Sequence, residues 1–237
     1  MSDPYLLLWL EGPLQSWGCD SRFDRRDSLP FPTKSGVIGL VCAALGAGGE
    51  QRELLARLSS LDMQVLSFSR IDSKGGIKPR EPLLRDFHMV GSGYDDADPW
   101  QSLLIPKTSE GKKAVGGGAK MTYRYYLQDA MFAVLLQAPG DMALDIAAAL
   151  QNPHWDLCLG RKNCAPTEFI YQGCFPCADN AYAAAVKLAT EKQRQIIFNV
   201  IQGADARGEV ITLNDVPLQF GESKRYRDRQ ITIIAGE

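Results

Sequence analysis

The segment PFPTKSGVIGL, residues 30–40, brings a lysine, a serine and glycines to the start of an expected helix. Lys34, Ser35 and Gly36 fall in the first turn, where backbone N–H groups have no partner within the helix and can bind phosphate. The pattern is not a Walker motif, because G-x-x-x-x-G-K-[ST] is absent. An ordinary capped helix with closely packed glycines explains the segment equally well, and both interpretations remain open.

Two short segments interleave aromatic residues with cations. Tyr123-Arg124-Tyr125-Tyr126 is one, and Lys224-Arg225-Tyr226-Arg227 is the other. Aromatic rings that stack on bases, flanked by cations that contact phosphates, are typical of proteins that bind single-stranded RNA. An edge strand with exposed Tyr and Arg would show the same pattern.

Histidine is scarce, with only His88 and His154 in the chain. This excludes nucleases of the HNH and HD classes, which need several histidines at metal-binding spacing. His88 is close in sequence to Arg85 and Tyr94, so a metal-independent ribonuclease is conceivable, with His88 as general acid or base. A lone histidine in an RNA-binding segment more often stacks or donates a hydrogen bond, and we favour that role.

Four cysteines fall within twenty residues and raise the question of zinc: Cys158, Cys164, Cys174 and Cys177. Four thiolates can complete a tetrahedral site. However, only Cys174 and Cys177 have the C-x-x-C spacing, and free, partly buried thiols are common. We expect structural thiols, with no bound metal and no cofactor.

Charge is unevenly distributed along the 237 residues, whose formal net charge is −2. An acidic chain is not a general nucleic-acid coat, but a locally basic surface suits a protein that binds RNA on one side. Cations gather in three places: Arg22, Arg25, Arg26 and Lys34; Lys107, Lys112, Lys113, Lys120 and Arg124; and residues 224–229. The apolar run Tyr5–Leu10 is too short for a signal peptide or a membrane span, so we expect a cytoplasmic protein.

The elements that must position these residues follow from the hydrophobic pattern. We expect an α+β fold with strands at 5–10, 63–69, 130–137 and near 155–159, and helices at about 36–46, 50–58 and 141–150. The order is that of a ferredoxin-like (RRM-like) domain. About sixty residues separate the middle strands, which predicts a long inserted thumb at about 72–127 in a domain spanning 1–160. Residues 161–237 are expected to form a smaller C-terminal β-rich subdomain, with strands at 195–202, 209–213 and 229–234 and a helix at 180–189.

The combination of these motifs resembles the Cas-five family of CRISPR-associated proteins. The similarity runs from residue 5 to about 230 and is carried by YLLLWLEGPLQSWG, FPTKSGVIGLVCAALG, LLRDFH, LGRKNCAP and DVPLQFG. It is strongest to the type I-E group. LGRKNCAP departs from the LGRKSCP expected there, and the Gly-rich stretch at 110–120 is an addition.

The resemblance implies a non-catalytic RAMP-superfamily subunit of a Cascade surveillance complex that serves antiviral defence. Such a subunit holds the 5′ handle of the CRISPR RNA, caps the backbone filament of CasC subunits and contacts the large subunit CasA. A related type I-C branch cleaves repeat RNA with Tyr, Lys and His. The Lys–His adjacency of that branch is missing here, because Phe87 precedes His88.

The sequence thus predicts an RNA-binding structural subunit. A metal-independent endoribonuclease that processes repeat RNA is the first alternative, and a protein-interaction domain without RNA contact is the second. The predicted RNA-binding residues are Trp17, Arg26, Lys34, Ser35, Gly36, Arg85, His88, Lys112, Lys113, Tyr123, Arg124, Arg161 and Lys162. For Trp17, burial in the core is the competing interpretation.

Overall fold

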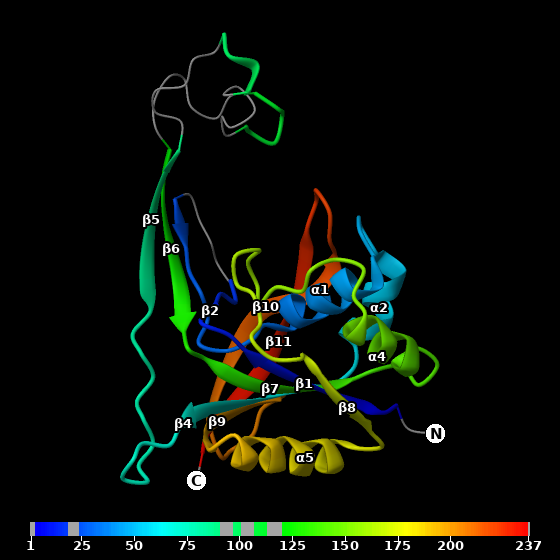
Figure 1. Ribbon diagram of the computed structural model, residues 1–237. Coiled ribbons are helices and arrows are strands. Elements are labelled where there is room, and N and C mark those ends of the chain that lie inside the picture. The colour runs from blue at the N-terminus through cyan, green and yellow to red at the C-terminus, as the bar shows by residue number, and fades with distance from the viewer. Residues whose placement is uncertain (1–2, 19–23, 91–96, 101–106, 113–119, 237) are drawn as a thin grey trace.

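The computed structural model describes residues 3–18, 24–90, 97–100, 107–112 and 120–236 (Figure 1). The chain forms an α+β fold around a seven-stranded antiparallel sheet. In the part of the chain that the structure describes, no helix is long and apolar enough to cross a membrane.

The sheet has the strand order β10-β11-β9-β4-β7-β1-β8. β1 is hydrogen-bonded to β7 on one side and to β8 on the other. Its continuous apolar sequence follows from burial, because both faces of β1 are covered. The strands are β1 (Tyr5–Glu11), β4 (Met63–Arg70), β7 (Met131–Gln137), β8 (Tyr171–Phe175), β9 (Arg194–Gln202), β10 (Glu209–Gln219) and β11 (Arg225–Ala235).

Helices cover both faces of the sheet (Figure 1). On one face lie α1 (Lys34–Leu45), α2 (Arg52–Ser59) and α4 (Ala143–Gln151), packed over Leu6, Leu8, Val65 and Phe132. On the other face, α5 (Ala178–Glu191) packs its alanines against Leu7, Trp9, Leu66 and Phe68. The alternation of side chains along each strand therefore supplies two separate cores.

An arm leaves the body between β4 and β7 (Figure 1). It consists of β5 (Leu84–Val90) and β6 (Lys120–Gln128), paired in antiparallel register with Phe87 opposite Tyr123. The base of the arm is widened by β2 (Leu14–Gln15) and β3 (Arg25–Arg26), which also pair with β6. The arm occupies the stretch where the strand spacing predicts an insertion.

Two expectations about the second half of the chain need correction. The strand predicted near 155–159 is wrong, since these residues form an irregular loop, and β8 takes the fourth position, beside β1. The main sheet also continues past the expected domain boundary at 160. β9 pairs with β4, and Val200 and Ile231 join the same core as α1, so residues 161–237 do not have a sheet of their own.

Candidate nucleic-acid interface

A groove of about 960 Å³ lies along α1. Its floor is the α1 surface around Ser35, Gly36 and Gly39. The loop 155–162 forms one wall, the end of the β10–β11 hairpin at 220–226 forms another, and residues 16–18 also line the groove. Four segments that lie far apart in the sequence therefore meet at one surface.

The start of α1 is capped from within the chain. Thr33 is the N-cap, and its Oγ1 accepts a hydrogen bond from the Gly36 N–H at 3.2 Å. The Lys34 N–H donates to Asp215 Oδ2 at 2.7 Å, and Arg229 holds the same carboxylate at 2.7 and 2.9 Å. A protein carboxylate thus occupies the place that the sequence suggested for a phosphate, and the helix dipole stabilises it there.

The side chain of Lys34 does not reach the groove, contrary to the expectation that it offers a cation to phosphate. It is 1% exposed, and its Nζ donates to the Leu61 carbonyl at 2.5 Å and to Gln202 Oε1 at 3.4 Å. Burial lowers the pKa of Lys34 to about 8, with the nearby Arg229 as a further cause. Lys34 therefore connects α1 to the sheet.

Trp17 also points inward, as expected if it belongs to the core and does not bind RNA. The indole is 1% exposed, and its Nε1 donates to Gln15 Oε1 at 3.0 Å. A Cβ on Gly36 would lie 2.8 Å from the Trp17 ring, so Gly36 is glycine because the helix and the indole approach closely. Trp17 and Gly36 form the packed end of the groove, and the geometry does not support Trp17 as a stacking platform.

The LGRKNCAP motif forms a tight loop that builds one wall. Leu159 and Cys164 are fully buried and pair through the Leu159 N–H and the Cys164 carbonyl at 2.7 Å. Gly160 has φ +95°, and a Cβ there would lie 1.8 Å from the Ser16 carbonyl oxygen, so only glycine fits. This anchoring leaves Lys162 exposed on the groove wall.

Residues outside the predicted set complete the groove. Trp155, for which no sequence pattern indicated a role, is 46% exposed on the same wall as Lys162. Lys224 and Tyr226 face it from the hairpin, together with Phe220. The mixed pattern at 224–227 did indicate this hairpin, although no residue of it is in the predicted set.

Arg161 turns away from the groove toward the base of the arm. Its guanidinium donates to the Tyr125 carbonyl at 3.2 Å and to the Arg26 carbonyl at 2.8 Å, and it lies 4.7 Å from the Tyr126 ring centroid. Arg161 thereby joins the groove wall to the arm. Arg26 itself is half-buried in β3.

The arm holds most of the remaining predicted residues, separated by face. Arg85 and Tyr123 lie on one face, with the Arg85 guanidinium 5.6 Å from the Tyr123 ring centroid and Phe87 packed against the same ring. His88 and Arg124 alternate with them and so lie on the other face. His88 Nε2 is 2.5 Å from Asp86 Oδ2, and Asp86 is opposite Arg124 in register.

Two predicted lysines, Lys112 and Lys113, are neighbours in the inserted sequence. Lys112 is exposed and forms an ion pair with Glu110 at 3.1 Å. Lys113 lies outside the described residues. The predicted set is therefore divided among the groove, the arm and, for Lys34 and Trp17, the core.

The four clustered cysteines differ in exposure. Cys164 is buried, Cys158 donates to the Lys162 carbonyl at 3.4 Å, and Cys174 and Cys177 are exposed near the start of α5. Among the described residues, no three His, Cys, Asp or Glu side chains come together in a way that could hold a metal ion.

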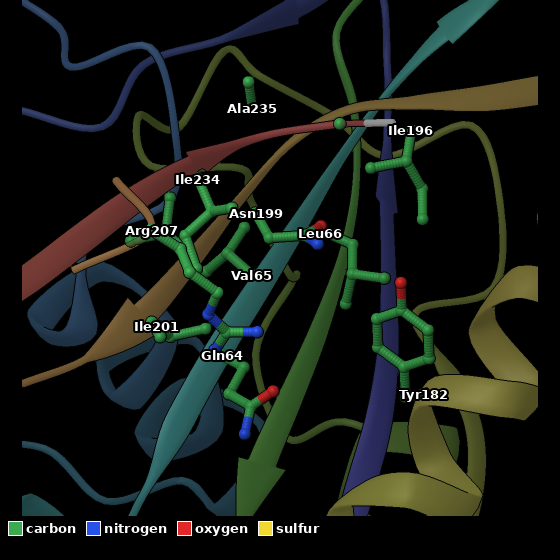
Figure 2. Close-up of a pocket in the computed structure, with 12 residues that line it drawn as sticks. Gln64, Val65, Leu66, Tyr182, Ile196, Asn199, Ile201, Arg207, Ile234 and Ala235 are labelled. Carbon is green, nitrogen blue, oxygen red and sulfur yellow. The ribbon is translucent and has the colours of Figure 1, made fainter. Parts of the chain in front are cut away.

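A second cavity, of about 650 Å³, lies on the α5 side of the sheet (Figure 2). Tyr182 of α5 and Asn199 of β9 border it. Its cation, Arg207, is paired with Asp205 at 2.6 Å. None of the predicted RNA-binding residues lines this cavity, so the groove along α1 is the better candidate for an anionic ligand.

Comparison with known proteins identifies the family. A family model described as CRISPR-associated protein (Cas_Cas5) matches residues 5–232. The chain belongs to this family. The resemblance carried by the sequence motifs is therefore confirmed, and the match covers the groove, the arm and all seven strands of the main sheet except the last residues of β11.

Individual relatives agree with the family assignment. The chain is 29% identical over 185 residues to the CRISPR system Cascade subunit CasD of Escherichia coli strain K12, covering 74% of this chain and 73% of CasD. A chain of a CRISPR RNA-guided surveillance complex matches with a TM-score of 0.69 and 30% identity over 98% of this chain and 90% of its own length. A Cas protein crystal structure matches at 26% identity and a TM-score of 0.58, with 98% and 94% covered.

Proposed function

We propose that this Cas5-family protein is a non-catalytic subunit of a type I-E-like Cascade complex and that it binds the 5′ handle of the CRISPR RNA. In this role it caps the CasC backbone filament, helps to seat the large subunit CasA, and works in the cytoplasm in antiviral defence. The similarity to CasD and to a chain of a surveillance complex supports the complex as its setting. The strand order β8-β1-β7-β4 within the sheet, with helices in the connections, supports the ferredoxin-like RAMP lineage.

The groove along α1 is the observation that carries the proposal. Lys162 of the loop 155–162 and Lys224 of the β10–β11 hairpin are exposed, and they line the groove together with Trp155 and Tyr226. Cations that contact phosphates and aromatic rings that accept unstacked bases are the two elements of single-strand RNA binding. Asp156, on the same wall as Trp155, is the acid among the groove residues.

The arm supplies a second surface for assembly. Phe87, Met89, Met121 and Tyr123 are exposed side by side on one face. A hairpin of two strands gains little stability alone, and an exposed apolar face of this kind indicates a protein partner. The adjacent backbone subunit is the partner we propose for this face, so Arg85 and Tyr123, which the sequence assigned to RNA, would contact protein instead. The face with His88 and Arg124 is left for RNA.

One assay can measure both RNA binding and RNA cleavage by this protein. The full-length chain is incubated with labelled single-stranded RNA copied from its organism's CRISPR repeat, with and without EDTA. We expect binding without cleavage, and the charge-reversed double variant Lys162→Glu/Lys224→Glu should lose it. Lys187→Glu, on the exposed side of α5, is the matched control and should bind normally. Equal binding by all three proteins would contradict the groove assignment.

One observation favours a second candidate, the metal-independent endoribonuclease. His88 Nε2 lies 2.5 Å from Asp86 Oδ2. A general base oriented by a carboxylate is a common catalytic pair, and the sequence did not reveal this one. Cleavage would then leave a new 5′-hydroxyl end in the presence of EDTA. If His88→Ala removes such cleavage while RNA binding is retained, the enzyme is the correct interpretation; without any cleavage by the wild type, it is not.

A further inference from the structure

Trp155 is a large aromatic side chain that is both exposed and firmly positioned. Its backbone N–H donates to the Ala43 carbonyl at 3.2 Å, and the His154 N–H donates to the Ala44 carbonyl at 2.9 Å. The loop therefore satisfies carbonyls at the end of α1. The His154 ring meets the Trp155 ring edge-on, with centroids 5.0 Å apart, and yet the Trp155 side chain stays 46% exposed.

Trp155 lines the groove together with Lys162 of its own loop and with Phe220, Lys224 and Tyr226 of the β10–β11 hairpin. A pre-positioned ring in a groove that also holds two lysines loses little conformational entropy when a ligand stacks on it. Since the cations favour a phosphodiester, the ligand that matches both features is a single nucleotide of an RNA strand.

The same groove is open to the α1 backbone at Gly39. Gly39 lies in the interior of α1, where glycine is less favourable than alanine. Packing explains Gly36, whose Cβ would meet Trp17, but a Cβ on Gly39 would meet nothing within 4 Å. The missing side chain leaves room for a flat group in the groove.

We infer that the groove is a subsite for one unstacked nucleobase, with Trp155 as the stacking platform, Gly39 as the open floor, and Lys162 and Lys224 as the contacts to the flanking phosphates. This inference rests on the proposed function and assigns one base of the bound RNA to one place in the fold. Stacking on Trp155 does not select among the four bases, but it requires that a base be present.

The test combines protein variants with RNA that lacks one base. The full-length chain is titrated with repeat-derived single-stranded RNA, unmodified or with one abasic nucleotide moved along the strand. For the wild type, one abasic position should weaken binding about tenfold. Trp155→Ala should weaken binding to unmodified RNA by a similar factor and lose its sensitivity at that position, whereas Trp155→Phe should keep most of both.

Two further variants separate this inference from damage to the fold. Gly39→Leu should block the subsite with no fall in melting temperature, because the added side chain enters open space and leucine favours the helix. Phe169→Ala removes an aromatic ring that is 89% exposed outside the groove and should bind as the wild type does. Wild-type affinity in both Trp155→Ala and Gly39→Leu would overturn the inference. If the double variant Lys162→Glu/Lys224→Glu still fails to bind RNA in that case, the proposed function stands without the base subsite. If the double variant binds RNA normally, both the base subsite and the proposed function are wrong.

Discussion

The carboxylate of Asp215 joins the Arg229 guanidinium, at 2.7 and 2.9 Å, to the first N–H of α1, at 2.7 Å. The two side chains are only 7% and 8% exposed. The β10–β11 hairpin, which is one wall of the groove, is thereby fixed to the helix that is its floor. The distance between the two groove surfaces depends on this buried ion pair.

Removal of the carboxylate should be costly. Asp215→Ala leaves Arg229 buried without its partner, and we expect the free energy of unfolding to fall by about 3–5 kcal/mol. Chemical denaturation measures this loss. Glu50→Ala removes the acid of an exposed pair with Arg52 and should change stability little. Similar losses for both variants would contradict a structural role specific to Asp215.

Lys34 should make stability depend on pH in the alkaline range. Its pKa is lowered from 10.5 to about 8 in the folded chain, so between these values the unfolded chain binds more protons. Stability contributed by this group therefore rises as pH increases from about 8 to 10.5. Lys34→Met lacks the titration, and denaturation at about pH 7.5, 9 and 10 should show the wild type gaining stability relative to this variant. A constant difference would mean that Lys34 keeps an ordinary pKa.

Gly160 should tolerate no side chain. Its φ is positive, and the Cβ of Gly160→Ala would lie 1.8 Å from the Ser16 carbonyl oxygen, so the loop must shift in this variant. We expect a lower melting temperature and weaker RNA binding, since the loop also carries Lys162. Gly49→Ala, at a similar φ of +83° but with no atom within 4 Å, measures the cost of conformation alone and should be the milder change.

The sequence predicts much of this arrangement and misses particular parts for physical reasons. The apolar runs and helical spacings locate β1, α1, β4, β7 and α5, because burial on one or two faces imposes those patterns. The fourth strand is missed because the short β8 carries glycine and cysteine and shows little alternation.

The site is predicted only in part. Lys34 and Trp17 have the residue types of a binding site, but whether a side chain points inward depends on distant partners. Asp215, which takes the place of a phosphate at α1, is 181 residues away from Lys34. Trp155 lies in a loop without any pattern around it, and only the fold brings it into one groove with Lys224 and Tyr226.

The salt dependence of RNA binding should report the phosphate contacts one at a time. Lys162→Ala and Lys224→Ala should each lower the slope of log K against log salt concentration by about 0.7, as expected for one phosphate contact on a single strand. Lys187→Ala should leave the slope unchanged. Unchanged slopes for both groove variants would place the phosphates elsewhere.

Crosslinking inside the complex shows where the RNA lies on this protein. The chain is coexpressed with the neighbouring CRISPR-associated genes and a repeat array in the presence of 4-thiouridine, and the purified complex is irradiated and analysed by mass spectrometry. We expect intact CRISPR RNA in the complex, crosslinked to peptides that contain Trp155–Lys162 and Phe220–Tyr226. A complex that holds RNA crosslinked only to its other subunits, or to this chain only outside the groove and the arm, would contradict this expectation.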